Sequence, residues 1–314
     1  MRAANITALG QPPIVVDASP PLVASGEALV AIDAVSFNPV DIAIGSGTFY
    51  AGHPALPYVP GIEAAGRLDG RPVFVQGAGL GIARNGLAAG VAVVPPAALI
   101  ALPAGIDPAT AAALGTAGLA GWMAIHEADV SADDVVVVLG ATGTVGSVAM
   151  QAARLSGAKR VVAVGRPSDR LAHLSSIADA TVSLGDEYAA RLTEACGGAP
   201  SVVIDLLWGQ PIIDTISTVA PRGRVVHVGA SAAPFAELPS AAIRGRQLRI
   251  IGYSNFGLNR DEFAARYLEL VDRACTGDID ISITRFSLDQ VADAWTATAT
   301  ASAKAVVCFM EDDR

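Results

Sequence analysis

Cysteine is scarce in this chain of 314 residues, and the three that occur, Cys196, Cys275 and Cys308, are widely spaced. No CxxC pair or Cys/His run accompanies them, which argues against a disulfide framework and against a structural zinc site. Free thiols are typical of a reducing compartment, and the N-terminal segment lacks the apolar core of a signal peptide. We therefore expect a cytoplasmic protein.

Positive charge is also in short supply, because 21 Lys and Arg residues face 30 Asp and Glu residues, for a net charge of −9. Nucleic acids and anionic membranes are bound through clustered positive surfaces, so neither is expected as a partner. Charged residues make up 16% of the chain and hydrophobic residues 52%, which excludes a disordered protein. The length suggests two domains.

Residues 85–106 carry no charge over about the length of a membrane span. The segment nevertheless contains the adjacent prolines Pro95 and Pro96, and Pro103 follows. Adjacent prolines in mid-span would break a helix. We predict a buried strand, a turn and a loop here, and no membrane segment.

Two patterns divide the chain near residue 108. Before it, short β-type runs such as residues 27–35, 71–77 and 90–96 are separated by Gly and Pro, which predicts a compact β-rich domain. After it, an Ala-rich helical stretch at residues 107–128 leads into alternating strands and helices. Alternation at this spacing predicts a doubly wound parallel sheet with right-handed crossovers.

A glycine-rich turn, GATGTVG at residues 140–146, lies between an apolar strand and an amphipathic helix. In this context glycines let the backbone approach a pyrophosphate and let the helix pack on the strand, while free N–H groups at the helix start meet the phosphates. A tight turn without a ligand is the alternative. The candidate dinucleotide-binding residues are Thr142, Gly143, Thr144, Val145 and Gly146.

The end of the next strand selects the cofactor. An acidic residue there would accept hydrogen bonds from the ribose 2′-hydroxyl of NAD. This chain has Arg166, Ser168 and Arg170 instead. Two guanidinium groups and a hydroxyl can bind a 2′-phosphate, so the sequence predicts NADPH. A pair of solvated arginines is the alternative.

Several shorter motifs occur in an order that is typical of one enzyme superfamily. Residues 36–41 (SFNPVD) contain an N-P-x-D segment, residues 60–66 (PGIEAAG) a G-x-E-x-A-G motif, and Lys304 stands in a late position usually occupied by a Gly-Lys pair. With the glycine turn, these motifs make the chain resemble the medium-chain dehydrogenase/reductase superfamily, and most closely its zinc-independent quinone oxidoreductase (zeta-crystallin-like) branch.

The resemblance implies an α/β fold with two domains. A GroES-like β-barrel catalytic domain would comprise residues 1–108, completed by residues 283–314, and a Rossmann NADP-binding domain with a doubly wound parallel sheet would comprise residues 109–282. It also implies a homodimer.

The resemblance further assigns site residues. Val228, Gly229 and Lys304 would contact the cofactor. Asn38 would lie beside the nicotinamide and the substrate, and Tyr50 falls where relatives carry a substrate-side tyrosine, with Phe49 as the alternative equivalent. Asn38 and Tyr50 are therefore the candidate catalytic donors, although capping the turn before Pro39 is an alternative role for Asn38.

The ligands that bind catalytic zinc in other members of the superfamily are missing. This chain has no Cys in residues 37–41, and it has Ile62 where those members carry a His. A zinc-polarised alcohol oxidation is therefore not expected, and no metal site is predicted. Reduction of a quinone or an activated C=C bond needs hydride from the nicotinamide and donors near the carbonyl oxygen, but no Lewis acid.

We therefore predict a zinc-independent, NADPH-dependent oxidoreductase that transfers hydride to a small-molecule quinone or α,β-unsaturated carbonyl. The alternatives are an enoyl reductase of a biosynthetic pathway and a weakly catalytic NADPH-binding sensor or structural protein. His227, in the apolar strand at residues 223–229, is interpreted as a packed core residue.

Overall fold

The computed structural model describes residues 1–166, 169–300 and 303–314. The chain forms two compact units, one of Met1–Thr116 with Ile281–Arg314 and one of Ala117–Asp280. The sequence analysis drew the corresponding boundaries at residues 108 and 282. Over the described residues, none of the helices combines the length and the apolar character that crossing a bilayer would require.

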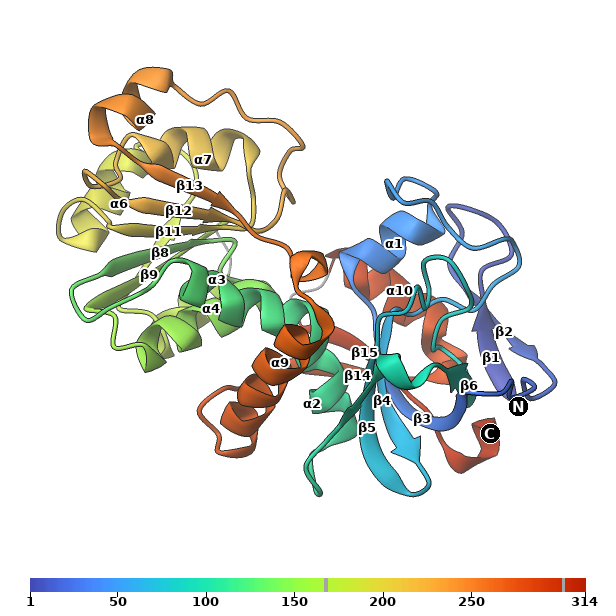
Figure 1. Cartoon of the computed structure of the whole chain (residues 1–314). Helices are drawn as coiled ribbons and strands as arrows, with labels where there is room; N and C mark the ends of the chain where they lie inside the picture. The colour runs from blue at the N-terminus through green and yellow to red at the C-terminus, as the bar shows by residue number, and fades with distance from the viewer. Residues whose placement is uncertain (167–168, 301–302) are drawn as a thin grey trace. The chain divides into compact units, whose positions relative to one another are not determined.

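The first unit is built on mixed β-structure (Figure 1). Its strands are β1 (Arg2–Asn5), β2 (Ile14–Asp17), β3 (Ala28–Ser36), β4 (Glu63–Leu68), β5 (Arg71–Gln76), β6 (Val91–Val94), β7 (Leu99–Ala101), β14 (Ile283–Ser287) and β15 (Lys304–Cys308). Its helices are α1 (Pro39–Gly45), α2 (Pro108–Ala113) and α10 (Val291–Thr300). The charge-free segment forms the predicted strand, β6, and turn, a short 3-10 helix, but a second strand, β7, follows where the sequence analysis expected a loop.

One sheet of this unit runs in the order β14-β15-β3-β4-β5-β7 within the described residues, and β6 also pairs with β3. β15 lies antiparallel to β3, with Val307 opposite Val35, so the end of the chain returns to the N-terminal strands. Alternate residues of β3, β4 and β5, such as Val30, Ala64 and Val75, are fully buried in a common apolar core. Strand alternation thus places one face of the sheet inward.

The second unit is a doubly wound parallel sheet (Figure 1). Its strands are β8 (Val135–Leu139), β9 (Arg160–Gly165), β10 (Ala180–Ser183), β11 (Val202–Asp205), β12 (Arg224–His227) and β13 (Arg249–Gly252). Its helices are α3 (Leu119–Glu127), α4 (Thr144–Leu155), α5 (Asp169–His173), α6 (Tyr188–Cys196), α7 (Gly209–Ile216), α8 (Ser240–Arg246) and α9 (Arg260–Cys275).

The strand order in this sheet is β10-β9-β8-β11-β12-β13 among the described residues. The order reverses between β8 and β11, which makes the carboxyl ends of these strands the switch point where such sheets bind ligands. Val137 and Val203 pack against α6 and α7 residues such as Leu192 and Ile212 in one core. The predicted fold class, a GroES-like domain with a Rossmann domain, is confirmed.

The helical stretch predicted at residues 107–128 is broken. α2 ends at Ala113, a π-helical turn spans Leu114–Gly118, and α3 follows. Gly115 has non-helical torsions (φ −55°, ψ −111°), and a Cβ there would lie 2.7 Å from the Phe74 ring. The break occurs because the backbone N–H of Thr116 donates to the Glu63 carboxylate of β4 at 2.5 Å. Helix propensity depends on local sequence and does not include such a long-range bond.

Candidate functional site

The glycine-rich turn connects β8 to α4 at the carboxyl edge of the parallel sheet. Gly140 has a left-handed φ of 85°, and its N–H donates to the carbonyl of Val164 on β9 at 2.9 Å. A Cβ on Gly146 would lie 2.6 Å from the Gly140 oxygen and 2.7 Å from the Ala141 Cα. Gly140 and Gly146 are therefore required by the fold itself, one for its torsion and one for close helix–strand packing.

Gly143 is not required in this way. Its φ of −89° and ψ of 168° are open to any residue, and the nearest atom to a Cβ built there is the Gly140 oxygen at 3.7 Å. Apart from its chain neighbours, no other atom of the described residues comes within 4 Å of a Cβ built on Gly143. This is the arrangement expected where a backbone must let another molecule come close.

The start of α4 presents unpaired backbone donors. The first backbone bond of the helix runs from the Ser147 N–H to the Gly143 carbonyl at 2.9 Å, and no side chain caps the helix. Within the described part of the chain, no backbone carbonyl outside the helix accepts from the N–H groups of Thr144, Val145 or Gly146. Together with the helix dipole, these groups favour an anion at this position.

Two arginines follow the end of β9, next to this turn. Arg166 and Arg170 are both exposed. Neither forms an ion pair with a carboxylate of the described residues. Ser168, the third predicted 2′-phosphate ligand, lies outside the described residues. Among the described residues, these two cationic side chains at the predicted position thus have no carboxylate counter-ion.

Val228 and Gly229 follow β12 and are half-buried. Their N–H groups donate to the carbonyl of Asp205, the last residue of β11, at 2.9 and 3.4 Å. The predicted strand end is therefore at the carboxyl edge of the sheet, on the side of β8 opposite to β9. This is the edge that also carries the glycine turn.

The first unit contains a buried network of polar side chains centred on Glu63. The Glu63 carboxylate is fully buried and accepts from Asn38 Nδ2 at 2.6 Å, from Ser36 Oγ at 2.5 Å and from the Thr116 hydroxyl at 2.6 Å. Lys304 Nζ lies 3.8 Å from Glu63 Oε1 and donates to the Phe37 carbonyl at 2.9 Å and to Asn38 Oδ1. The sequence analysis quoted Glu63 only within the G-x-E-x-A-G motif and assigned it no role.

Asn38 is locked in this network. Its side chain is bonded at both ends, its residue is 2% exposed, and its backbone N–H donates to Asp41 Oδ2 at 2.8 Å at the start of α1. Lys304 is also buried. The bond at the start of α1 is therefore made by the backbone of Asn38 to the Asp41 side chain, while the Asn38 side chain bonds Glu63 and Lys304. The predicted catalytic role of Asn38 and the cofactor role of Lys304 stay predictions.

Burial shifts the protonation of two members of the network. Desolvation raises the pKa of Asp41 from its ordinary 3.8 to about 7, although the N–H groups of Asn38 and Ile62 oppose the shift. Desolvation also lowers the pKa of Lys304, against the attraction of Glu63 and Asp41. Burial thus brings the pKa of Asp41 close to neutrality and disfavours the charged form of Lys304.

Tyr50, the other predicted donor, is 85% exposed, and its ring packs on Phe49 with centroids 4.5 Å apart. Both residues lie just after α1, in the first unit. Phe49 therefore stays the alternative equivalent of the tyrosine that relatives carry on the substrate side. The substrate-side role of Tyr50 stays a prediction.

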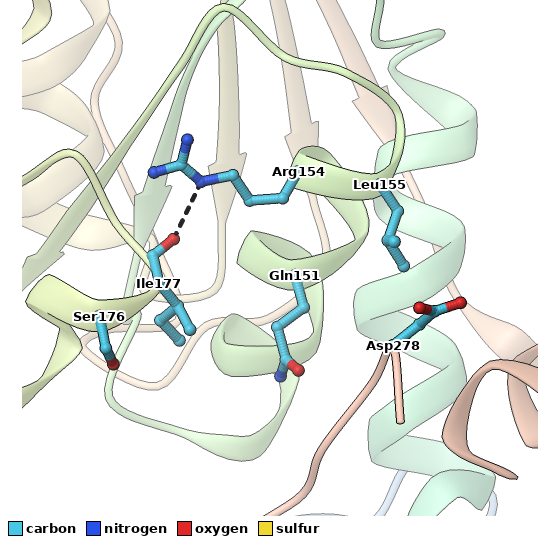
Figure 2. A pocket seen from close by; sticks show the side chains of 6 residues that line it. All are labelled: Gln151, Arg154, Leu155, Ser176, Ile177 and Asp278. Atoms are coloured by element: carbon cyan, nitrogen blue, oxygen red, sulfur yellow. Dashed lines mark hydrogen bonds between the residues drawn. The ribbon is translucent and has the colours of Figure 1, made fainter. Parts of the chain in front are cut away.

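A shallow hollow of about 370 Å³ lies at the other end of α4 (Figure 2). The residues that line it are Gln151, Arg154, Leu155, Ser176, Ile177 and Asp278. Arg154 forms an ion pair with Asp179 at 2.9 Å and donates a hydrogen bond to the Ile177 carbonyl at 3.2 Å. Because α4 begins at the glycine turn, its last residues lie at the opposite edge of the sheet. This hollow is therefore not part of the candidate dinucleotide site.

Among the described residues, no group of three or more His, Cys, Asp or Glu side chains is arranged to hold a metal ion. Residues 37–41, the stretch in which zinc-binding relatives carry a Cys, contain no Cys, and Ile62, at the position of their His, is a buried apolar side chain.

Comparisons with known proteins agree with this geometry. Residues 144–273 match the family model described as zinc-binding dehydrogenase. The quinone oxidoreductases of Rattus norvegicus and Homo sapiens are each 28% identical to the chain over 281 residues, covering 84% of it and 83% of the relative.

Solved structures give the same result. The quinone oxidoreductase of Thermus thermophilus, solved also in complex with NADPH, superposes with a TM-score of 0.83 at 26% identity, covering 98% of this chain and 100% of that one. An NAD-dependent alcohol dehydrogenase superposes with a TM-score of 0.86 at 24% identity, over 98% and 99% of the two chains, which shows the fold alone. These similarities support an oxidoreductase of the medium-chain dehydrogenase/reductase superfamily, and within it the quinone oxidoreductase branch.

Proposed function

We propose that this protein is an NADPH-dependent reductase that transfers hydride to a quinone or an α,β-unsaturated carbonyl without zinc. The observation that carries the proposal is the pair of arginines, Arg166 and Arg170, without carboxylate partners beside an open glycine turn. A relative at 26% identity, the Thermus thermophilus quinone oxidoreductase, is known in complex with NADPH, which supports the choice of cofactor.

The residues present fit such a cofactor. The N–H groups at the start of α4 and the free space at Gly143 suit a pyrophosphate, and Arg166 and Arg170 suit a 2′-phosphate through charge-assisted bonds. Val228 and Gly229 would hold the nicotinamide end. When bound, NADPH supplies a hydride to an electrophilic carbon of the acceptor.

The zinc-independent character of the proposed reaction rests on the side chains at the ligand positions. Residues 37–41 contain no Cys, and the Ile62 side chain offers no lone pair to a metal. Negative charge on the acceptor oxygen must then be stabilised by hydrogen-bond donors of the protein. Asn38 and Tyr50 are the proposed donors.

The role of Asn38 is tested by the Asn38→Ala variant. Because the side chain also bonds Glu63 and Lys304, the variant will lose stability, so turnover and NADPH affinity must be measured on folded protein at a temperature below its melting transition. We expect turnover to fall at least tenfold more than NADPH affinity, in the range seen when one oxyanion donor is removed. A loss of stability with unchanged turnover would make Asn38 structural.

The proposed function is tested by titrating the purified protein with NADPH and with NADH, followed by a panel of quinones, enones and enoyl thioesters. We expect NADPH to bind tighter than NADH and to be oxidised by one class of acceptor. Oxidation by thioesters alone would favour the enoyl reductase. Binding without oxidation by any acceptor would favour the nucleotide-binding sensor, and no binding of either nucleotide would refute the proposal.

A further inference from the structure

A carboxylate and an imidazole meet at the carboxyl edge of the parallel sheet. Asp205 is the last residue of β11 and is fully buried. Its Oδ1 accepts from the N–H groups of Leu207 and Trp208, each at 3.0 Å, and its Oδ2 lies 3.0 Å from His227 Nδ1. His227 is the last residue of β12 and the register partner of Asp205.

This contact sets which nitrogen of His227 carries a hydrogen. Asp205, as a carboxylate already accepting two N–H groups, can only accept from the ring, so in the neutral imidazole Nδ1 carries the hydrogen and Nε2 carries a lone pair. No described residue bonds Nε2, and Nε2 is not among the buried atoms left without a partner, so it is open to solvent. The side chain is 29% exposed, which corrects its interpretation as a packed core residue.

Trp208 holds the ring from one face. The indole and imidazole centroids are 4.1 Å apart at an interplanar angle of 39°. Trp208 itself has φ 59° and ψ −162°, a region that an L-residue adopts at a cost. A strained residue beside an oriented imidazole is more typical of a ligand site than of a packing contact.

The position of His227 within the sheet identifies the ligand it faces. Leu139, Asp205, His227 and Gly252 stand in one row, as the last paired residues of β8, β11, β12 and β13. The glycine turn follows Leu139, and Arg166 follows β9 on the other side of β8. If the phosphates occupy the turn and the 2′-phosphate lies at β9, the other half of the dinucleotide lies over β11 and β12.

We infer that His227, oriented by Asp205, is a binding residue for the nicotinamide nucleoside half of NADP, with Nε2 accepting a hydrogen bond from a ribose hydroxyl or the carboxamide N–H. The inference rests on the proposed function. Asp205 is a positioning residue, since its own oxygens are occupied within the protein. Loss of one such neutral hydrogen bond corresponds to about a three- to tenfold change in Kd.

The His227→Asn variant tests this directly. The asparagine amide nitrogen takes the place of Nδ1 and keeps the bond to Asp205, while Nε2 is removed, so the fold is retained. We expect the Kd for NADP⁺ to rise about three- to tenfold and the Kd for 2′,5′-ADP, which lacks the nicotinamide half, to stay unchanged. His53→Asn is the matched control, because His53 is an exposed histidine whose Nδ1 also bonds the protein, to the Pro54 carbonyl at 2.7 Å.

A readout without turnover is the ring resonance of His227. The chain has four histidines, so the signal that the variant removes is assigned by difference. NADP⁺ should shift this resonance and 2′,5′-ADP should not. The 3-acetylpyridine analogue of NADP⁺ has no carboxamide N–H, so a shift retained with it identifies the ribose as donor, and a shift lost identifies the carboxamide.

The outcomes separate the two proposals. If NADP⁺ binds the wild-type protein but neither the resonance nor the affinity of His227→Asn changes, the inference is overturned and the proposed function stands. If NADP⁺ does not bind the wild-type protein at all, the proposed function fails and the inference fails with it.

Discussion

Gly143 and Gly146 of the β8–α4 turn have different physical roles, although both belong to the same sequence motif. Gly146 packs against the backbone of Gly140 and Ala141, whereas Gly143 contacts nothing closer than 3.7 Å from a Cβ built on it. A side chain at position 146 would disturb the packing of the protein itself. A side chain at position 143 would disturb only a molecule that binds there.

We predict that Gly143→Ala folds with equal or slightly greater stability, by up to about 1 kcal/mol, because alanine loses less entropy on folding. Its Kd for NADPH should rise at least about tenfold, because the methyl group keeps the phosphates away from the backbone. Chemical denaturation and fluorescence titration measure the two quantities.

The matched variant is Gly146→Ala, which should lose about 1–3 kcal/mol of stability through overpacking. Unchanged NADPH affinity in Gly143→Ala would show that no phosphate approaches this turn.

Asp41 makes stability depend on pH in an unusual direction. Folding raises its pKa from 3.8 to about 7, so the native state holds the proton more tightly than the unfolded chain. Its contribution to stability is therefore present below pH 4 and is lost as the pH rises toward 7.

We expect the Asp41→Asn variant to remove this dependence, because it keeps one acceptor for the N–H groups of Asn38 and Ile62 but has no charge. Between pH 4 and pH 7 the unfolding free energy of the wild type should fall by up to a few kcal/mol relative to that of the variant. Urea titrations across this range measure it, and parallel curves for the two proteins would contradict the assignment.

At the scale of elements, the junction of β9 and α5 decides which nicotinamide cofactor is bound. Exposed arginines without protein counter-ions contribute little to stability, so their removal isolates binding. We predict that the Arg166→Ala, Arg170→Ala double variant weakens NADPH at least about tenfold and leaves NADH within about twofold, as expected for charge-assisted bonds to a 2′-phosphate.

Arg244→Ala, at an exposed arginine of α8, controls for the loss of a positive charge away from the glycine turn. Titration of both cofactors against all three proteins measures the effect. An equal loss of NADPH and NADH affinity in the double variant would argue for a general electrostatic role and against NADP selection.

At the scale of the whole molecule, one edge of the parallel sheet is unprotected. β13 ends the sheet order, Ile250 on it is 40% exposed, and α8 beside it contributes no buried residue. Unpaired strand edges with apolar side chains pair with other strands unless they are covered. We propose that a second copy covers this edge, as the family resemblance also implies.

Light scattering after size exclusion should then give a dimer at micromolar concentration, and Ile250→Asp should give a monomer. Leu22→Asp is the control, because Leu22 is 95% exposed and lies in the first unit. A wild-type monomer, or a dimer that survives Ile250→Asp, would rule out this interface.

What the sequence determined by itself is local. Five apolar residues in β8, the glycines that follow and the helix pattern after them lie within about twenty residues, so the turn and the parallel sheet were predictable from spacing alone. The fold class followed from the alternation of such units.

Only the tertiary structure decided the polar pairs. Lys304 bonds Asn38, 266 residues away in the sequence, and His227 bonds Asp205, 22 residues away. No local sequence pattern around these residues predicts either partner. The break at Gly115 has the same origin, since Glu63 binds the N–H of Thr116 from 53 residues away. Propensity and periodicity describe neighbours along the chain, whereas these bonds depend on which strands become neighbours in space.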